Sequence, residues 1–174
     1  LDEEQQMYSG NILHSAAEMQ GYIRMLLDIN SARREFEIFR KETNPQVLME
    51  EVVSQAKILV LEKSIGIEVD LRNLPEQMAL DESAFCRAVM NAFANAVEYT
   101  PDGGKIKISG FEEDNHLAVC IEDSGRGFTE EEIKRAFEQF YQGDKSRNSK
   151  LHYGMGLFIA KSVTEAHGGR IELG

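Results

Sequence analysis

Apolar residues recur every seven positions along the first forty residues, a stretch that contains no proline. The two rows in this register are Ile12, Met19 and Leu26, and Tyr8, Tyr22 and Ile29. The pattern predicts a long helix with an apolar seam, typical of a coiled coil or a helical hairpin. Because one helix cannot bury such a seam alone, we expect a partner helix from another segment or another subunit.

A break at Thr43-Asn44-Pro45 separates this arm from the rest of the chain. Asn44 is a favourable N-cap and Pro45 suits a first helical turn, so a second helix is expected from there to about Lys63. Asp81 and Thr129 are expected to cap two further helices in the same way. The pattern then predicts, in order, strand 65–71, strand 78–80, helix 81–99, strand 105–110, strand 117–123, helix 129–137, helix 156–167 and strand 170–173.

These elements predict an α+β fold, a two-layer α/β sandwich whose mixed sheet is covered by helices on one face and which follows the long N-terminal helix. The stretch 139–153 is polar and lacks clear periodicity, which is typical of a long functional or mobile loop. We divide the chain into residues 1–42, the arm, and residues 43–174, the domain. Because it starts at Leu1 and stops within a strand-like run, we interpret it as a fragment.

The charge balance excludes one class of partner. The chain carries 30 acidic and 19 basic residues, a net charge of −11, and no basic stripe that would neutralise the phosphates of a nucleic acid. No apolar run approaches the roughly 18 residues that span a membrane. Cys86 and Cys120 both have apolar neighbours and are interpreted as small core residues. Since an acidic chain does not attract nucleotides in general, any phosphate site has to be local.

One loop after a strand carries a carboxylate and two glycines, in the order Asp123-Ser124-Gly125-Arg126-Gly127. Glycine tolerates positive φ and has no Cβ, so this backbone can turn sharply and lie flat against a ligand. A carboxylate at a strand end accepts hydrogen bonds from an amino group such as the exocyclic amine of adenine. Taken alone, the motif is weak, and a simple β-turn explains it better.

Two further clusters are compatible with the same ligand. Asn91 and Asn95 lie at i and i+4 on a helix, so both amides can point into one site. Amide oxygens suit Mg²⁺, although two solvated asparagines would produce the same pattern. Gly154-Met155-Gly156-Leu157 directly precedes a helix, whose first N–H groups and dipole favour an anion.

With these clusters in this order, the chain resembles the catalytic core of bacterial sensor histidine kinases, within the ATPase superfamily shared with gyrase, Hsp90 and mismatch-repair proteins. The resemblance covers residues 16–174 and implies a Bergerat-type ATP-binding fold. The blocks that carry it are the N box at 91–101, the G1 box at 123–127, the F box at 137–141, the G2 box at 154–157 and the closing segment 165–169.

The resemblance also implies roles for single residues. Asp123 would bind the adenine amine, and Tyr99 would flank the adenine or the ribose. Asn95 would be the principal Mg²⁺ ligand, with Asn91 beside it. Close approach of the backbone to ATP is implied at Gly125, Gly127, Gly154 and Gly156, with Leu157 next to them.

Residues 137–155 would form a mobile ATP lid. Its cations Lys145, Arg147 and Lys150 would be either γ-phosphate ligands or ordinary surface charges. Hydrolysing relatives place a glutamate at the position of Asn91, and an amide cannot act as a base. The resemblance therefore implies that the site holds the γ-phosphoryl group for a histidine nucleophile rather than hydrolysing ATP efficiently.

The implied activity is that of a protein-histidine kinase in two-component signal transduction. The acceptor histidine would lie outside this chain, on a hairpin of which residues 1–42 are the second helix, and phosphate would pass on to the receiver domain of a response regulator. The arm would form a homodimer. The chain would belong to the cytoplasmic portion of a bacterial membrane sensor, itself soluble and inactive alone.

Several positions depart from the family pattern. His14 is followed by Ser15-Ala16-Ala17 instead of an acidic residue, so it is interpreted as a polar residue of the helix surface. Glu98 stands where a lysine is usual; it would weaken ATP binding if it faces the phosphates, or else point to solvent. Gln142 replaces a common arginine, and His152 lies near a missing glycine.

These departures leave two alternatives open. One is a dimeric signalling module of the same fold whose ATP site has decayed. The other is a conformational ATPase of the same superfamily, against which Asn91 argues.

Overall fold

The computed structural model describes residues 38–143 and 154–174, together with Gln5, Tyr8, Ser9, Ile12, Ser15 and Met19. These six positions are helical. The rest of the predicted arm up to residue 37 lies outside the described residues, as do the lid positions 144–153. Residues 38–40, which the heptad pattern assigned to the end of the arm helix, are irregular.

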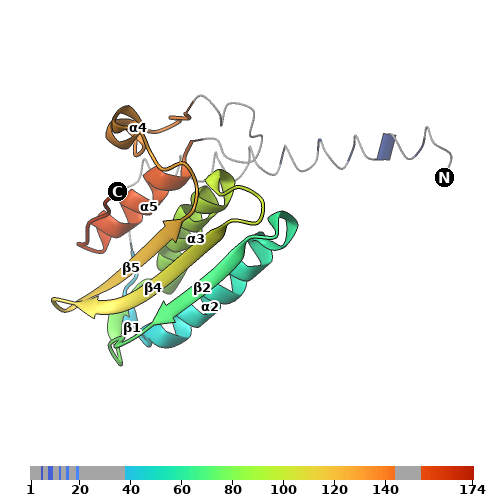
Figure 1. Ribbon diagram of the computed structural model, residues 1–174. Helices are drawn as coiled ribbons and strands as arrows, with labels where there is room; N and C mark the ends of the chain where they lie inside the picture. Colours follow the sequence, from blue (N-terminus) through green and yellow to red (C-terminus); the bar gives the residue numbers. More distant parts are fainter. Residues whose placement is uncertain are drawn as a thin grey trace.

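A three-stranded sheet forms one layer of the domain (Figure 1). It contains β2 (Gly66–Leu71), β4 (Lys105–Glu113) and β5 (His116–Asp123), in the order β2-β4-β5. β2 runs parallel to β4, whereas β4 and β5 are antiparallel. The sheet is therefore mixed, as the sequence predicts, and Asp123 lies at the end of β5, opposite Ile106.

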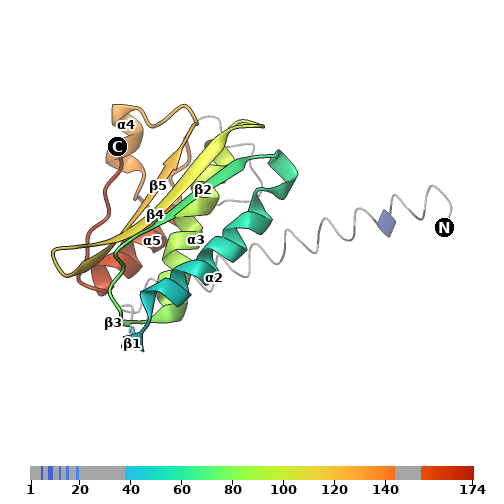
Figure 2. The same cartoon turned by 60° about the horizontal axis from the view of Figure 1, so that its bottom comes forward.

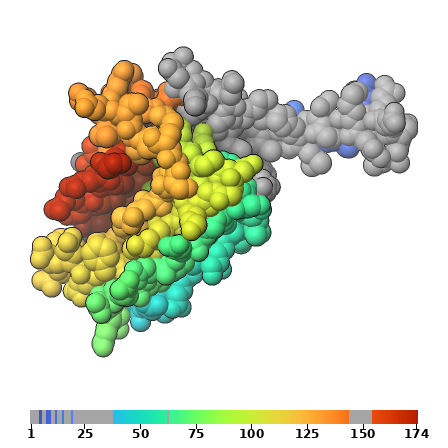
Figure 3. All heavy atoms as spheres, in the orientation of Figure 1, coloured from blue at the N-terminus to red at the C-terminus, as the bar shows by residue number. Residues whose placement is uncertain are grey.

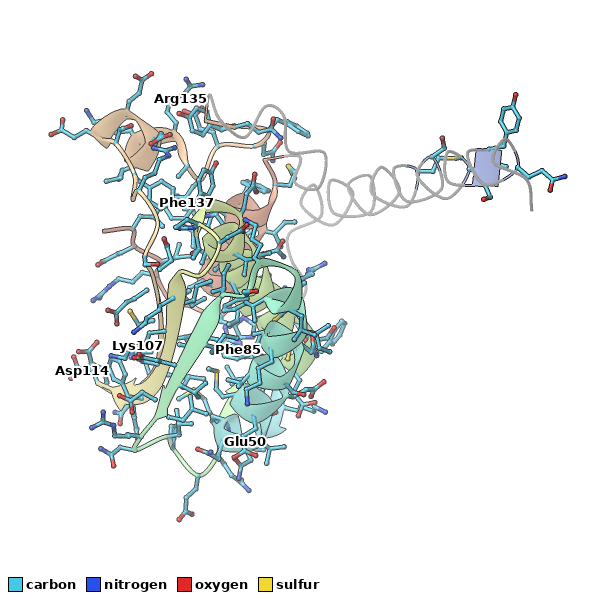
Figure 4. All side chains as sticks on the ribbon, turned by 45° about the vertical axis from the view of Figure 1, so that its right-hand side comes forward. Glu50, Phe85, Lys107, Asp114, Arg135 and Phe137 are labelled. Atoms are coloured by element: carbon cyan, nitrogen blue, oxygen red, sulfur yellow. The ribbon has the colours of Figure 1, made fainter. Side chains whose placement is uncertain are left out.

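Three helices cover one face of this sheet (Figure 2). They are α2 (Pro45–Leu59), α3 (Glu82–Tyr99) and α5 (Gly156–Ala166). Figure 4 shows the two sides of the sheet: Phe85 lies in the helical layer, and Lys107 points away from it on the open face. The α+β class and the one-sided helical layer are thus confirmed.

The predicted caps explain where the helices begin. The Asn44 side chain accepts hydrogen bonds from the N–H groups of Gln46 and Val47, at 2.9 and 3.2 Å. Asp81 accepts one from Ala84 at 3.0 Å. Thr129 forms a capping box at the start of α4 (Glu130–Arg135). Each cap satisfies N–H groups of a first turn that have no partner within the helix.

Two apolar clusters hold the layers together. In the first, Phe93 of α3 and Met49 of α2 pack on Ile106 and Ile108 of β4, and all four side chains are fully buried. The second cluster lies between α3 and α5 and includes Ala84, Ala88, Met155, Ile159, Ala160 and Val163. Because α3 belongs to both clusters, its position fixes the sheet and α5 at once.

The structure corrects four details of the sequence prediction. The helix expected to reach Lys63 ends at Leu59, and Leu61–Lys63 form a 3₁₀ turn. β3 (Met78–Leu80) pairs with a strand that was not predicted, β1 (Lys41–Thr43). Residues 170–173 form no strand, since none of the described strands pairs with them, and Ile171 packs on the cluster between α3 and α5.

The fourth correction concerns Cys120. Its alternating position on β5 turns the thiol to the open face of the sheet, so Cys120 is exposed, whereas Cys86 is half-buried. Both thiols are free. None of the helices in the described ranges combines the length and the apolar character needed to cross a membrane.

Candidate functional site

A groove with two adjoining lobes lies where the C-terminal half of α3 meets the loop after β5 and the start of α5. The lobes have empty volumes of about 490 and 430 Å³, both open to solvent. Five residues line both of them, which makes the lobes parts of one groove: Asn95, Tyr99, Ala136, Tyr141 and Leu157. Figure 3 shows the segment that carries α4, in orange, next to α5, in red, at this end of the molecule.

Asp123 and Gly127 line the first lobe. One carboxylate oxygen of Asp123, Oδ1, accepts the N–H of Gly125 at 2.7 Å, and within the described residues this is its only hydrogen bond. The internal bond orients the carboxylate and leaves Oδ2 to accept from a ligand. Gly127 has φ of +66°, a conformation that few residues other than glycine adopt.

Gly125 is not among the residues that line the two lobes, and its implied close approach to ATP stays a prediction. A Cβ there would lie 2.6 Å from Asp123 Oδ1 and 2.7 Å from the carbonyl oxygen of Tyr99. The absence of a side chain therefore lets the loop pack against the end of α3. Gly125 thus lies between the carboxylate of Asp123 and the backbone carbonyl of Tyr99.

Asn91 and Asn95 of α3 both line the second lobe, and Asn95 also lines the first. The Nδ2 of Asn91 donates to the carbonyl of Arg87 at 2.8 Å. Its Oδ1 points toward α5, 3.4 Å from the position that a Cβ of Gly156 would take. Two amide oxygens on one wall form an uncharged donor set of the kind that holds Mg²⁺ together with phosphate oxygens, so these residues fit that ion.

The turn before α5 closes the second lobe. Gly154 has φ of +69°, and a Cβ there would lie 2.5 Å from the carbonyl oxygen of Tyr141. The following helix has no side-chain cap at Met155, and among residues 38–143 and 154–174 no side chain accepts from the N–H groups of its first turn. Gly156 and Leu157, which begin the helix, line the lobe and present this turn to it.

The structure adds residues that the sequence analysis did not assign to the site. Arg126 and Glu132 line the first lobe, and Phe128, Ala136, Tyr141 and Gly143 lie around them. The hydrogen bonds from Arg126 and from the Thr129 N–H hold the pKa of Glu132 well below its usual value, at about 2. The guanidinium lies 5.4 Å from the centroid of the Tyr99 ring. A threonine followed three residues later by a glutamate is a capping signature, which was visible in the sequence.

Of the other predicted positions, the structure describes some and not others. Glu98 and Gln142 line the second lobe. Phe137 of the F box lies between α4 and α5 (Figure 4), with the Lys161 ammonium 5.3 Å from its ring centroid. Outside the described residues lie His14, Lys145, Arg147, Lys150 and His152.

Residues 80–174 match a family model described as histidine kinase-, DNA gyrase B-, and HSP90-like ATPase. The chain belongs to this ATPase family. Its matched segment contains α3, the loop after β5 and α5, which are the elements that form the two-lobed groove.

Individual relatives show which members of the ATPase family this chain is similar to. The sensor histidine kinase SpaK of Bacillus subtilis is 34% identical over 173 residues, which cover 99% of this chain and 38% of SpaK. The structure of the mycobacterial sensor histidine kinase MprB is 28% identical, with a TM-score of 0.61 over 75% of this chain and 81% of that one. This chain is thus a histidine kinase catalytic domain. It spans less than two fifths of the length of SpaK.

A solved structure of lower sequence identity has the same fold. The crystal structure of full-length ShkA in complex with AMPPNP has a TM-score of 0.82, covering 100% of this chain and 37% of that one. At 23% sequence identity, this match shows the shared fold alone.

Proposed function

We propose that this histidine kinase domain binds Mg²⁺·ATP in the two-lobed groove and transfers the γ-phosphoryl group to a histidine in two-component signalling. The observation that carries the proposal is the meeting of three separate segments, represented by Asp123, Asn95 and Gly156, around one groove. The AMPPNP complex of ShkA, which shares the fold, supports a ligand of the ATP type.

The first lobe suits the adenine base of ATP. With Oδ1 engaged by Gly125, the carboxylate of Asp123 accepts a hydrogen bond from the exocyclic amine of adenine. Guanine presents a carbonyl oxygen at that position, which a carboxylate repels. Tyr99 flanks the base or the ribose from α3, and Gly127 gives the loop a flat approach to the ligand.

The second lobe suits the phosphates. Asn95 would be the principal Mg²⁺ ligand, with Asn91 beside it, and the bound ion would neutralise charge on the β- and γ-phosphates. The first turn of α5, at Gly156 and Leu157, offers N–H groups and a favourable dipole to the same anion. Lys145 and Arg147 are proposed as further phosphate ligands.

The amide of Asn91 favours transfer over hydrolysis. Its Nδ2 is engaged by the carbonyl of Arg87, and neither atom of the amide can take a proton from water. The residues of the groove then serve to hold the γ-phosphoryl group in line for an external nucleophile, and such positioning supplies much of the acceleration in phosphoryl transfer.

The proposed partners follow from the class of protein. Residues 1–42 would form a dimer and belong to the hairpin that carries the acceptor histidine. The phosphoryl group would then pass to the receiver domain of a response regulator. We place the domain on the cytoplasmic side of a bacterial membrane sensor, and the charge of −11 argues against nucleic acid as a partner.

One observation favours a second candidate, a signalling module with an impaired nucleotide site. Glu98 and Gln142 line the second lobe, where cations would stabilise a triphosphate better. In that case the groove would bind Mg²⁺·ATP weakly or not at all.

Calorimetric titration of the chain with Mg²⁺·AMPPNP and with the corresponding guanine nucleotide tests the proposal. We expect binding of the adenine form only, and its loss in Asp123→Asn, whose amide presents a donor to the base amine. Absence of binding by the unaltered chain would favour the impaired module. With a protein that includes the acceptor hairpin, ³²P transfer to histidine should exceed steady-state phosphate release, and the reverse result would identify an ATPase.

A further inference from the structure

Four residues of α3 with oxygen-bearing side chains line the second lobe: Asn91, Asn95, Glu98 and Tyr99. Asn91, Asn95 and Glu98 are spaced at i, i+4 and i+7, so they lie on one face of the helix. Asn95 and Glu98 are neighbours one turn apart on that face. The opposite wall of the lobe is the turn at Gly154 and Gly156, where a phosphate would bind.

The backbone and the side chain of Glu98 have different surroundings. Its carbonyl oxygen accepts a hydrogen bond from the ammonium of Lys63 at 3.0 Å, which anchors the end of α3. Glu98 belongs to the lining of the lobe, and within residues 38–143 and 154–174 its carboxylate forms no ion pair. A half-buried carboxylate beside a triphosphate repels it unless a cation lies between them.

We propose that Glu98 is a magnesium ligand, which completes an all-oxygen site with the amides of Asn91 and Asn95. This inference rests on the proposed function and extends it to a residue for which the family pattern implies no such role. The amides contribute no charge, whereas Mg²⁺ in nucleotide sites is typically held by one or two carboxylates and by the phosphates of the substrate. With Glu98 as a ligand of the ion, the attraction of Mg²⁺ for both the carboxylate and the phosphates would offset the repulsion between them.

The metal dependence of nucleotide binding distinguishes this role from simple repulsion. A ligand of the ion strengthens binding only when Mg²⁺ is present. A carboxylate that merely repels the phosphates weakens binding both with the ion and without it. The ratio of the two affinities therefore reports on Glu98 directly, without any measurement of phosphate transfer.

The experiment is calorimetric titration of the chain with AMPPNP, once in Mg²⁺ and once in EDTA, for the unaltered protein and for Glu98→Gln. We expect the variant to lose about tenfold or more of its affinity in Mg²⁺, in the range seen when groups that support a metal site are removed. In EDTA it should bind as well as the unaltered protein or better. Glu131→Gln, an exposed position of α4 outside both lobes, is the matched control and should change neither affinity.

The opposing results are distinct. If Glu98→Gln binds AMPPNP equally tightly or more tightly in both conditions, with an unchanged ratio of the affinities, the carboxylate is not a metal ligand and the inference alone is overturned. If the unaltered chain binds no AMPPNP in either condition, the proposed function is overturned together with it. The thermal unfolding midpoint of Glu98→Gln checks that any loss of affinity occurs in a folded protein.

Discussion

The guanidinium of Arg126 and the carboxylate of Glu132 form a double hydrogen bond on the wall of the first lobe, with 2.8 Å between Nη1 and Oε2. The same Oε2 accepts the N–H of Thr129 at 2.9 Å. Glu132 thus holds the loop after β5 and caps α4 at once. Because Arg126 also covers the ring of Tyr99, the pair connects α4 to the end of α3.

This pair predicts that Glu132→Gln lowers the free energy of unfolding at neutral pH and that the difference from the unaltered protein shrinks in acid. The folded protein holds the pKa of Glu132 at about 2, below its ordinary value of 4.5, chiefly through the hydrogen bonds from Arg126. A lowered pKa stabilises the fold above the ordinary value, and that contribution is lost as the pH falls from about 4.5 toward 2. We expect the variant to lose about 1 kcal/mol at neutral pH, mostly from the charge-assisted hydrogen bonds of Arg126, and the difference to shrink below pH 4.5.

Urea denaturation between neutral and acidic pH measures the effect, with Glu131→Gln as a control of equal charge change on the same helix. The control should shift the free energy of unfolding by a few tenths of a kcal/mol at most. A difference between Glu132→Gln and the unaltered protein that stays constant with pH would contradict the prediction.

Gly125→Ala should disrupt the site without touching the ligand. The new Cβ would lie 2.6 Å from Asp123 Oδ1 and 2.7 Å from the carbonyl oxygen of Tyr99, so the loop has to move away from α3. Overpacking of this kind costs about 1–3 kcal/mol of stability, and displacement of Asp123 should weaken AMPPNP binding as well. Gly66→Ala is the comparison, because its Cβ would make only ordinary contacts, at 3.8 Å. Retained affinity in Gly125→Ala would show that the loop tolerates the shift.

Lys63→Met should loosen the end of α3. The ammonium of Lys63 donates to the carbonyls of Val97 and Glu98, at 2.8 and 3.0 Å, and so caps a helix whose last carbonyls have no partner within the helix. Loss of a cation at this end costs about 1–2 kcal/mol when it is partly buried. Lys57→Met, at an exposed position near the end of α2, should have little effect on the unfolding free energy. Equal effects of the two substitutions would contradict a capping role.

Asp81→Ala should free β1 as well as shorten α3. The carboxylate of Asp81 accepts hydrogen bonds from Phe39 N–H at 2.9 Å and from Ala84 N–H at 3.0 Å. Although burial raises the pKa of Asp81, these two bonds hold it below its usual range. We expect a loss of about 1 kcal/mol of stability and faster amide exchange over residues 39–43.

Hydrogen exchange followed by mass spectrometry measures the second effect. Asp102→Ala, in the exposed turn after α3, controls for the loss of a carboxylate. Unchanged exchange in residues 39–43 of Asp81→Ala would show that the β1 and β3 pairing alone holds this segment.

The helix starts, the sheet strands and the nucleotide motifs of this protein follow from its sequence. Asn44 and Asp81 act on N–H groups two or three residues away, and the strand periodicity of β4 and β5 is read within a few residues. Such signals involve only residues close together in the sequence, so they can be recognised without knowledge of the tertiary structure. The order of the Asn91, Asp123 and Gly154 motifs along the chain likewise identifies the family.

Tertiary structure alone decided how these pieces meet. β1 has only three residues and depends on a partner 39 positions away at the Lys41 and Leu80 pair, and residues 170–173 have strand-like residues but no described strand to pair with. The placement of Arg126 over the ring of Tyr99, and of Glu98 in the wall of the second lobe, depends on where the loop after β5 and α5 pack against α3. Pairing and packing require the atoms of a distant segment, and no local pattern specifies which segment that is.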